Sequence, residues 1–152
     1  MHKIILKVRK PDDSREYYPS VTVKMERLEF SRREVYDIDF NRNAKDPIHS
    51  SLTRWWRSAL STRRGRGTTH APNLAFSNGV PFLLYIGELP IAITKTGSRY
   101  QLNGKTESAN TIANALARVT VTAMRENSPT KLMSALMKVL SLSEDVKYVL
   151  EN

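Results

Sequence analysis

The sequence predicts an α+β fold with a mainly antiparallel sheet, one central helix and a C-terminal group of three helices. Apolar residues alternate with period two in the first forty residues and again from Phe82 to Leu102, whereas helical spacing occurs between these regions and at the end of the chain. Strands and helices that are segregated along a chain are typical of α+β folds. The length of 152 residues and the hydrophobic fraction of 40% fit one domain over 1–152.

Three strands are predicted in the first forty residues. His2–Val8 is a short apolar-rich segment, and Val21–Met25 alternates apolar with polar side chains. A third alternation follows at Tyr36, Ile38 and Phe40. Three consecutive strands joined by short turns predict an antiparallel meander.

The central helix is predicted to begin at Asp46 and Pro47, which suit the cap and the first helical position. Apolar residues then recur at helical spacing as far as about Leu60, including both tryptophans of the chain. Residues 61–73 contain two glycines and a proline, and they are predicted to form a flexible Arg/Gly loop.

The second half of the chain is predicted to form three more strands and then the three C-terminal helices. The strands are Phe82–Ile86, Ile91–Lys95 and Arg99–Leu102, with glycine-containing turns between them. The helices are expected over Glu107–Arg125, from Ser128 and Pro129 onward, and, as a last short helix, from Ser143 onward. The methionines and leucines of these helices form an apolar surface suited to the core or to a homodimer interface.

Composition limits the classes of function. The net charge of +9 indicates an anionic partner rather than a particular fold. The absence of cysteine excludes disulfides, thiolate metal sites and a cysteine nucleophile. Because no apolar stretch approaches the length of a membrane span, and the N-terminal apolar run is only Ile4 to Leu6, we expect a soluble, cytoplasmic protein without a membrane partner.

The stretch from Pro47 to Gly87 contains no acidic residue. It does contain five arginines and both tryptophans: Arg54, Arg57, Arg63, Arg64, Arg66, Trp55 and Trp56. Arginine presents a planar fork of donors that fits phosphate oxygens or a guanine edge. Unopposed basic charge beside flat aromatics predicts a nucleic-acid-binding surface, with DNA preferred over RNA.

Two aromatic residues and a basic hairpin extend this predicted surface. Adjacent tryptophans cannot both lie at the centre of one helix face, so Trp56 is the candidate for an exposed ring that stacks on a base. The hairpin from Ile91 to Lys105 adds four candidates: Lys95, Arg99, Tyr100 and Lys105. A β-hairpin is narrow enough to enter a major groove.

The segment Gly104-Lys105-Thr106 resembles the end of a nucleotide-binding phosphate loop, but the rest of that motif is absent. The motif needs a second glycine five residues earlier, where this chain has Arg99. Lys105 therefore keeps only a weaker predicted role, which is to hold one phosphate of a nucleic acid beside a helix start.

These observations predict a non-enzymatic nucleic-acid-binding protein of low sequence specificity that needs no cofactor. Two alternatives remain open. In one, the basic face docks on an acidic protein partner such as a polymerase. In the other, Asp37 and Asp39, which share one face of a strand, act as paired metal ligands of a nuclease.

Overall fold

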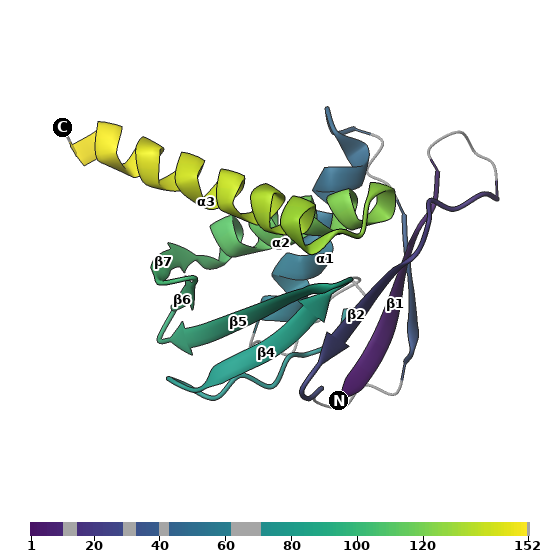
Figure 1. Cartoon of the computed structure of the whole chain (residues 1–152), viewed down its shortest axis with the longest axis horizontal. Coiled ribbons are helices and arrows are strands. Elements are labelled where there is room, and N and C mark those ends of the chain that lie inside the picture. The colour runs from purple at the N-terminus through teal and green to yellow at the C-terminus, as the bar shows by residue number, and fades with distance from the viewer. Residues whose placement is uncertain (11–14, 29–32, 40–42, 62–70, 152) are drawn as a thin grey trace.

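A computed structural model of the chain describes residues 1–10, 15–28, 33–39, 43–61 and 71–151, with side chains as far as Ser141 (Figure 1). Within these residues, seven strands form one sheet in the order β3-β1-β2-β4-β5-β6-β7. The strands are β1 (His2–Val8), β2 (Val21–Met25), β3 (Val35–Ile38), β4 (Pro81–Ile86), β5 (Leu89–Thr96), β6 (Arg99–Leu102) and β7 (Lys105–Ser108). The helices are α1 (Pro47–Leu60), α2 (Ala109–Arg125) and α3 (Pro129–Glu151).

The prediction of an α+β fold with a mainly antiparallel sheet is confirmed. Strands β4 to β7 form a consecutive antiparallel meander, and β2 joins it through antiparallel pairing of Val23 with Ile86. The predicted meander of the first three strands is wrong, because β3 pairs with β1 in parallel, with Ile5 opposite Val35. The outer edge of β2 is occupied by β4, so the third strand lies beside β1 instead. A strand that starts where β2 ends runs in the direction of β1, which makes the pair parallel.

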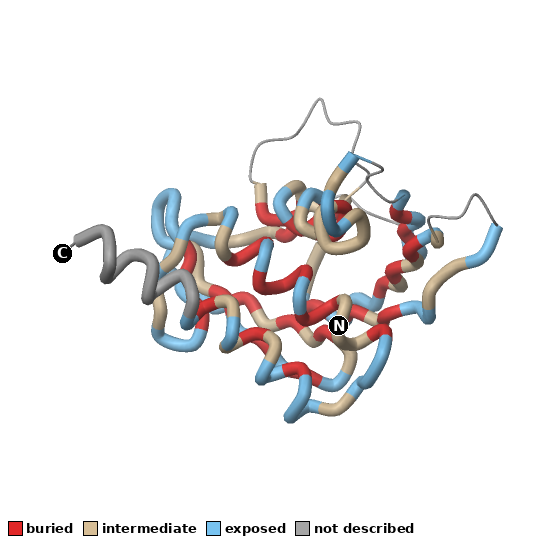
Figure 2. Tube along the Cα trace, turned by 90° about the horizontal axis from the view of Figure 1, so that it is seen from above, coloured by how far each residue is buried: buried red, intermediate tan, exposed pale blue. Residues whose placement is uncertain are grey.

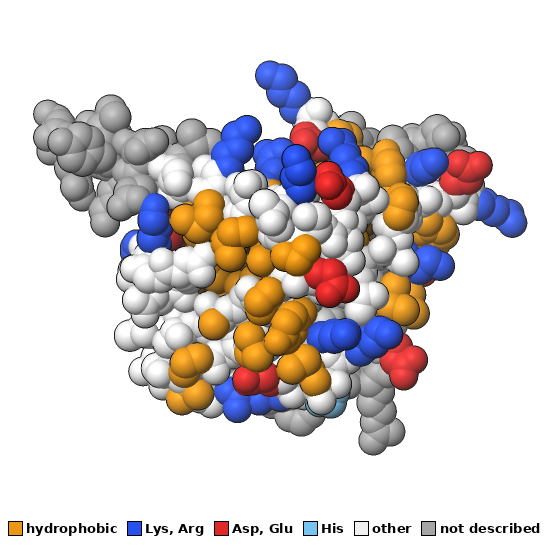
Figure 3. All heavy atoms as spheres, viewed as in Figure 1, with side chains coloured by type: hydrophobic (Ala, Val, Ile, Leu, Met, Phe, Trp, Pro, Cys, Tyr) orange, Lys and Arg blue, Asp and Glu red, His pale blue; other side chains and the backbone are white. Residues whose placement is uncertain are grey.

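The hydrophobic core lies between the sheet and the helices α1 and α2 (Figure 1). Every second residue of the long strands is buried on this face, and Figure 2 shows the resulting alternation along the trace. The helix α3 packs mainly against α2. We call the opposite side of the sheet the open face; its side chains are exposed or half-buried, among them Lys3, Lys24, Tyr85 and Ala92. Figure 3 shows hydrophobic side chains gathered over the sheet, with Lys and Arg side chains toward the margins.

The start of α1 is confirmed at the predicted residues. The Asp46 side chain accepts a hydrogen bond from the backbone N–H of His49 at 3.2 Å, and Pro47 is the first helical residue. This cap satisfies one of the backbone donors that a helix start leaves without a partner.

The C-terminal region differs from the prediction in two ways. Residues Lys105–Ser108 form the strand β7, so α2 begins at Ala109, two residues later than expected, with the Ser108 hydroxyl as its cap. The helix α3 runs without interruption to Glu151, so two helices follow the sheet rather than three. Serine and acidic residues at 143–145 suit a helix start but do not break a helix, and no glycine or proline follows Pro129. Among the described residues, no helix combines the length and the apolar character that a membrane crossing requires.

Candidate nucleic-acid interface

The helix α1 separates its aromatic residues from its arginines. Trp55 and Trp56 are buried, whereas Arg54 and Arg57 are exposed on the other side. Neither arginine forms an ion pair within the part of the chain that the structure describes.

Arg57 contributes to a hollow of about 710 Å³ between the end of α1 and the β5–β6 hairpin. Its lining comes from both sides: Arg57 and Ser58 from α1, Ser61 just after the helix, and Lys95, Gly97 and Ser98 from the hairpin. The described lining residues include no carboxylate. We call this surface the basic hollow.

The hairpin is held in place by hydrogen bonds to the segment that precedes β4. The backbone N–H of Gly97 donates to the Asn78 side-chain oxygen at 2.8 Å, and the N–H of Gly79 donates to the Lys95 carbonyl at 2.8 Å. The Lys95 ammonium donates to the Gly97 carbonyl at 2.6 Å, which keeps its charge beside the turn. These hydrogen bonds hold the β5–β6 turn, and with it the Lys95 ammonium group, against the segment that precedes β4.

Tyr100 ties the hairpin to α1 at the base of the basic hollow. Its hydroxyl donates a hydrogen bond of 2.7 Å to the carbonyl of Leu60, the last residue of α1. Its ring meets Phe76 edge-on at 5.7 Å between centroids. Tyr100 thus gives a partner to a carbonyl that the helix end leaves without one. The contacts of Tyr100 with the end of α1 and with Phe76 therefore set how far Arg57 lies from Lys95.

Replacing Tyr100 by phenylalanine should lower stability and make it less sensitive to alkaline pH. Burial raises the pKa of the Tyr100 hydroxyl above its ordinary value of 10.0, and the nearby Arg57 charge partly opposes this shift. Since the folded state keeps the proton that the unfolded chain loses, this contribution to stability is complete below about pH 10 and is lost above it. The lost hydrogen bond should cost about 1 kcal/mol at neutral pH.

Urea unfolding between about pH 8 and 11 measures both effects. The wild type should lose stability more steeply than Tyr100→Phe as pH rises. Parallel pH profiles for the two proteins would contradict the raised pKa of the Tyr100 hydroxyl.

Two predicted stacking residues are not available for stacking. Trp56 is fully buried, and its indole N–H donates to the Thr120 hydroxyl at 3.0 Å. Tyr100 is 3% exposed. The prediction that these rings are exposed for stacking is wrong, because tertiary packing places both inside the core. Trp55 contacts both Trp56 and Tyr36 edge-on. The apolar face of α1 is therefore wide enough to bury both tryptophans.

Arg99 and Lys105 do not line the basic hollow with Lys95. Lys95 pairs with Tyr100, and both side chains lie on the side of the sheet that faces the helices. Arg99 precedes Tyr100 in β6, so its side chain lies on the open face. Lys105 is half-buried on the edge strand β7, opposite Leu102. Glu107 lies opposite Tyr100, so a carboxylate occupies the neighbouring position on the helix-facing side.

The three arginines of the predicted Arg/Gly loop, Arg63, Arg64 and Arg66, lie outside the described residues. Of the predicted set, the structure brings Arg57, Lys95 and the buried Tyr100 together at the basic hollow, with Arg54 on the same helix as Arg57. Sequence reasoning missed the hydroxyls of Ser58, Ser61 and Ser98. The available signal was position in the chain, because Ser58 follows Arg57 directly and Ser98 belongs to the same turn as Gly97.

The paired carboxylates of the nuclease alternative lie on the edge strand β3 and just beyond it. Asp37 and Asp39 are exposed, and Asp39 lies 3.9 Å from the Arg9 guanidinium. Within the described ranges, no group of three or more His, Asp or Glu residues is placed to hold a metal ion. The geometry gives this alternative no further support.

Comparison with known proteins gives no match. Neither a protein-family model, nor a curated protein, nor a solved structure matches the chain.

Proposed function

We propose that this protein is a non-enzymatic nucleic-acid-binding protein, with DNA as the preferred ligand, and that the basic hollow holds its phosphate backbone. One observation carries the proposal: Arg57 and Lys95, from separate elements, line one hollow that has hydroxyls and no described carboxylate. A guanidinium and an ammonium bind phosphate oxygens by charge-assisted hydrogen bonds, and serine hydroxyls add neutral donors.

The whole chain supports this choice of ligand. Its net charge of +9 attracts a polyanion over distances longer than a hydrogen bond. No described aromatic ring lines the hollow in an exposed position, and hydroxyls and cations do not distinguish bases. Binding is therefore mainly to the backbone and depends weakly on sequence. Because a chain without cysteine fits a reducing compartment, we place this function in the cytoplasm.

The double variant Arg57→Gln/Lys95→Gln should bind nucleic acid about tenfold to a hundredfold more weakly at about 0.1 M salt, because two charge-assisted contacts are lost. The slope of log affinity against log salt should become less negative by about 1.8 units for duplex DNA, since each phosphate contact contributes about 0.9. Fluorescence anisotropy with labelled single-stranded DNA, duplex DNA and duplex RNA at several salt concentrations measures both quantities.

The matched control is Lys131→Gln/Lys138→Gln, which removes the same charge from exposed positions on α3. This control should retain most of the affinity and the salt slope. Equal losses in the two double variants would mean that only net charge matters. Salt-independent binding, or no binding at low salt, would refute the proposed ligand and leave an acidic protein as the alternative partner.

A further inference from the structure

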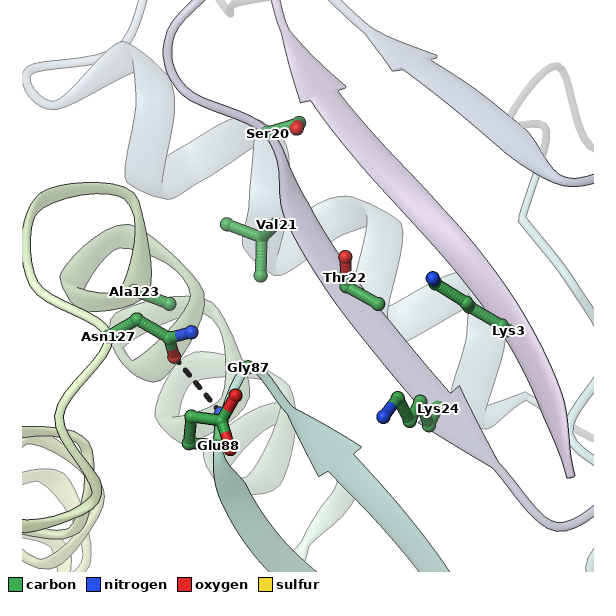
Figure 4. Close-up of a pocket in the computed structure, with 9 residues that line it drawn as sticks. All are labelled: Lys3, Ser20, Val21, Thr22, Lys24, Gly87, Glu88, Ala123 and Asn127. Atoms are coloured by element: carbon green, nitrogen blue, oxygen red, sulfur yellow. Dashed lines mark hydrogen bonds between the residues drawn. The ribbon is translucent and has the colours of Figure 1, made fainter.

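A second, smaller pocket of about 230 Å³ lies away from the basic hollow (Figure 4). It is bounded by β1 and β2, by the turn between β4 and β5, and by the end of α2. Its polar lining consists of Lys3, Ser20, Thr22, Lys24, Glu88 and Asn127.

The pocket lies where the pairing of β2 with β4 stops. β4 ends at Ile86, opposite Val23, and the backbone N–H of Gly87 then donates to the Thr22 carbonyl at 2.9 Å. Val21 and Thr22 of β2, and Ser20 before them, have no β4 residue paired with them. The other wall is formed by Ala123 at the end of α2 and by Asn127 in the connection to α3.

Two lysines lie side by side on the adjacent strands β1 and β2 that line this pocket. Lys3 and Lys24 are direct partners in the antiparallel pairing of β1 with β2, and both are exposed on the open face. Like charges at opposing positions of a sheet destabilise it. Within the described part of the chain, neither ammonium forms an ion pair. An anion between them would relieve this repulsion.

A hydrogen bond from the β4–β5 turn fixes the orientation of the Asn127 side chain. Its side-chain oxygen accepts a hydrogen bond from the backbone N–H of Glu88 at 3.0 Å, drawn as the dashed line in Figure 4. With the oxygen engaged, the amide nitrogen points toward the Thr22 side of the pocket (Figure 4). This nitrogen is a donor only, and the Thr22 hydroxyl is a further donor. The donors of the pocket thus outnumber its acceptors.

Glu88 is the one carboxylate among the described lining residues. It occupies the turn beside Asn127 and forms no ion pair with Lys3 or Lys24. A bound anion would be repelled by Glu88 and attracted by the two lysines. The balance of two ammonium groups against one carboxylate still favours negative charge.

We propose that this pocket binds a phosphate group, held by the ammonium groups of Lys3 and Lys24, the Asn127 amide and the Thr22 hydroxyl. A tetrahedral oxyanion accepts hydrogen bonds from several directions, which suits donors that come from β1, β2 and the α2–α3 connection. The phosphate is either a free ion or part of a nucleotide. This inference does not depend on the proposed function of the basic hollow.

Titration of the intact protein with inorganic phosphate, followed by calorimetry or by NMR shifts, tests the proposal. Lys3→Gln/Lys24→Gln should weaken phosphate binding at least about tenfold, because two charge-assisted hydrogen bonds are removed. Glu88→Gln should tighten binding severalfold, because it removes the opposing charge. Phosphate should also raise the melting temperature of the wild type more than that of the lysine variant.

The control Lys131→Gln/Lys138→Gln removes the same net charge and should bind phosphate like the wild type. Equal phosphate affinity in the two lysine variants, or weaker binding by Glu88→Gln, would overturn the proposal. Arg57→Gln/Lys95→Gln should retain phosphate binding here, which separates this result from a failure of the nucleic-acid proposal. A nucleoside monophosphate that binds more tightly than inorganic phosphate, with the nucleoside alone binding weakly, would identify a nucleotide as the source of the phosphate.

Discussion

Replacing Trp56 by alanine should lower the free energy of unfolding by about 3–5 kcal/mol. The side chain is among the largest that are fully buried, and it lies where α1 packs against α2. The substitution leaves a cavity and also leaves the Thr120 hydroxyl without its indole donor. Urea unfolding followed by far-UV circular dichroism measures the loss. A change below about 1 kcal/mol would show that Trp56 is not packed as described.

The conservative variant Trp56→Phe separates stability from binding. It should cost less than alanine, because most of the apolar contact is kept. Since the ring is buried, nucleic-acid affinity should equal that of the wild type. An affinity loss as large as that of Arg57→Gln/Lys95→Gln would instead restore the stacking role that the sequence suggests. Thr120→Val, combined with Trp56→Phe in a double-mutant cycle, isolates the contribution of the hydrogen bond.

Replacing Gly87 by alanine should destabilise the protein by about 2–5 kcal/mol, through two costs that add. The residue has φ +56°, a conformation that L side chains rarely adopt. An added Cβ would also overlap with the Asn127 side-chain oxygen. Asn127 would have to give up its hydrogen bond to the Glu88 backbone, so the α2–α3 connection would lose its tie to the β4–β5 turn. Thermal and urea unfolding measure the total cost.

Gly97→Ala is the matched control for the backbone cost alone. Gly97 has φ +62°, close to that of Gly87, but an added Cβ would meet no heavy atom within 4 Å. Its substitution should cost only about 1–2 kcal/mol. Adding Asn127→Ala to Gly87→Ala should cost little further, or recover part of the loss, because the overlap disappears. Equal losses for the two glycine variants would show that Asn127 moves aside freely.

Much of the fold could be predicted because local signals agree with tertiary packing. The cap at Asp46 with proline after it fixes the start of α1, and the alternation over 82–102 fixes three strands of the meander. In each case the residues that bury the core are those that the local pattern marks. Local and global preferences then favour the same structure.

The errors arose where the local pattern allowed more than one arrangement. A four-residue strand such as β3 has the same alternation whether it pairs with β1 or β2, so the sequence does not fix its neighbour. Serine followed by acidic residues suits both a helix start and the interior of α3, and the continuing seam of Leu132, Leu136 and Leu140 favours one helix. The segment Lys105–Ser108 was too short to show a strand period.

The candidate site was predictable in charge but not in geometry. The acid-free stretch identified Arg57, and the hairpin identified Lys95, yet only the sheet register shows that Lys95 and Arg99 face opposite sides. The burial of Trp56 could not be decided from helical spacing, because that spacing does not fix the width of the apolar face. Lys3 and Lys24 became neighbours only through strand pairing between β1 and β2.

The two outermost strands of the sheet have a consequence for solubility. β3 and β7 are each four residues long, and they carry the charged residues Asp37 and Lys105. Short edges with charged side chains make a poor template for a strand from another molecule. The apolar strands at the centre of the sheet are thus shielded at both ends from edge-to-edge aggregation.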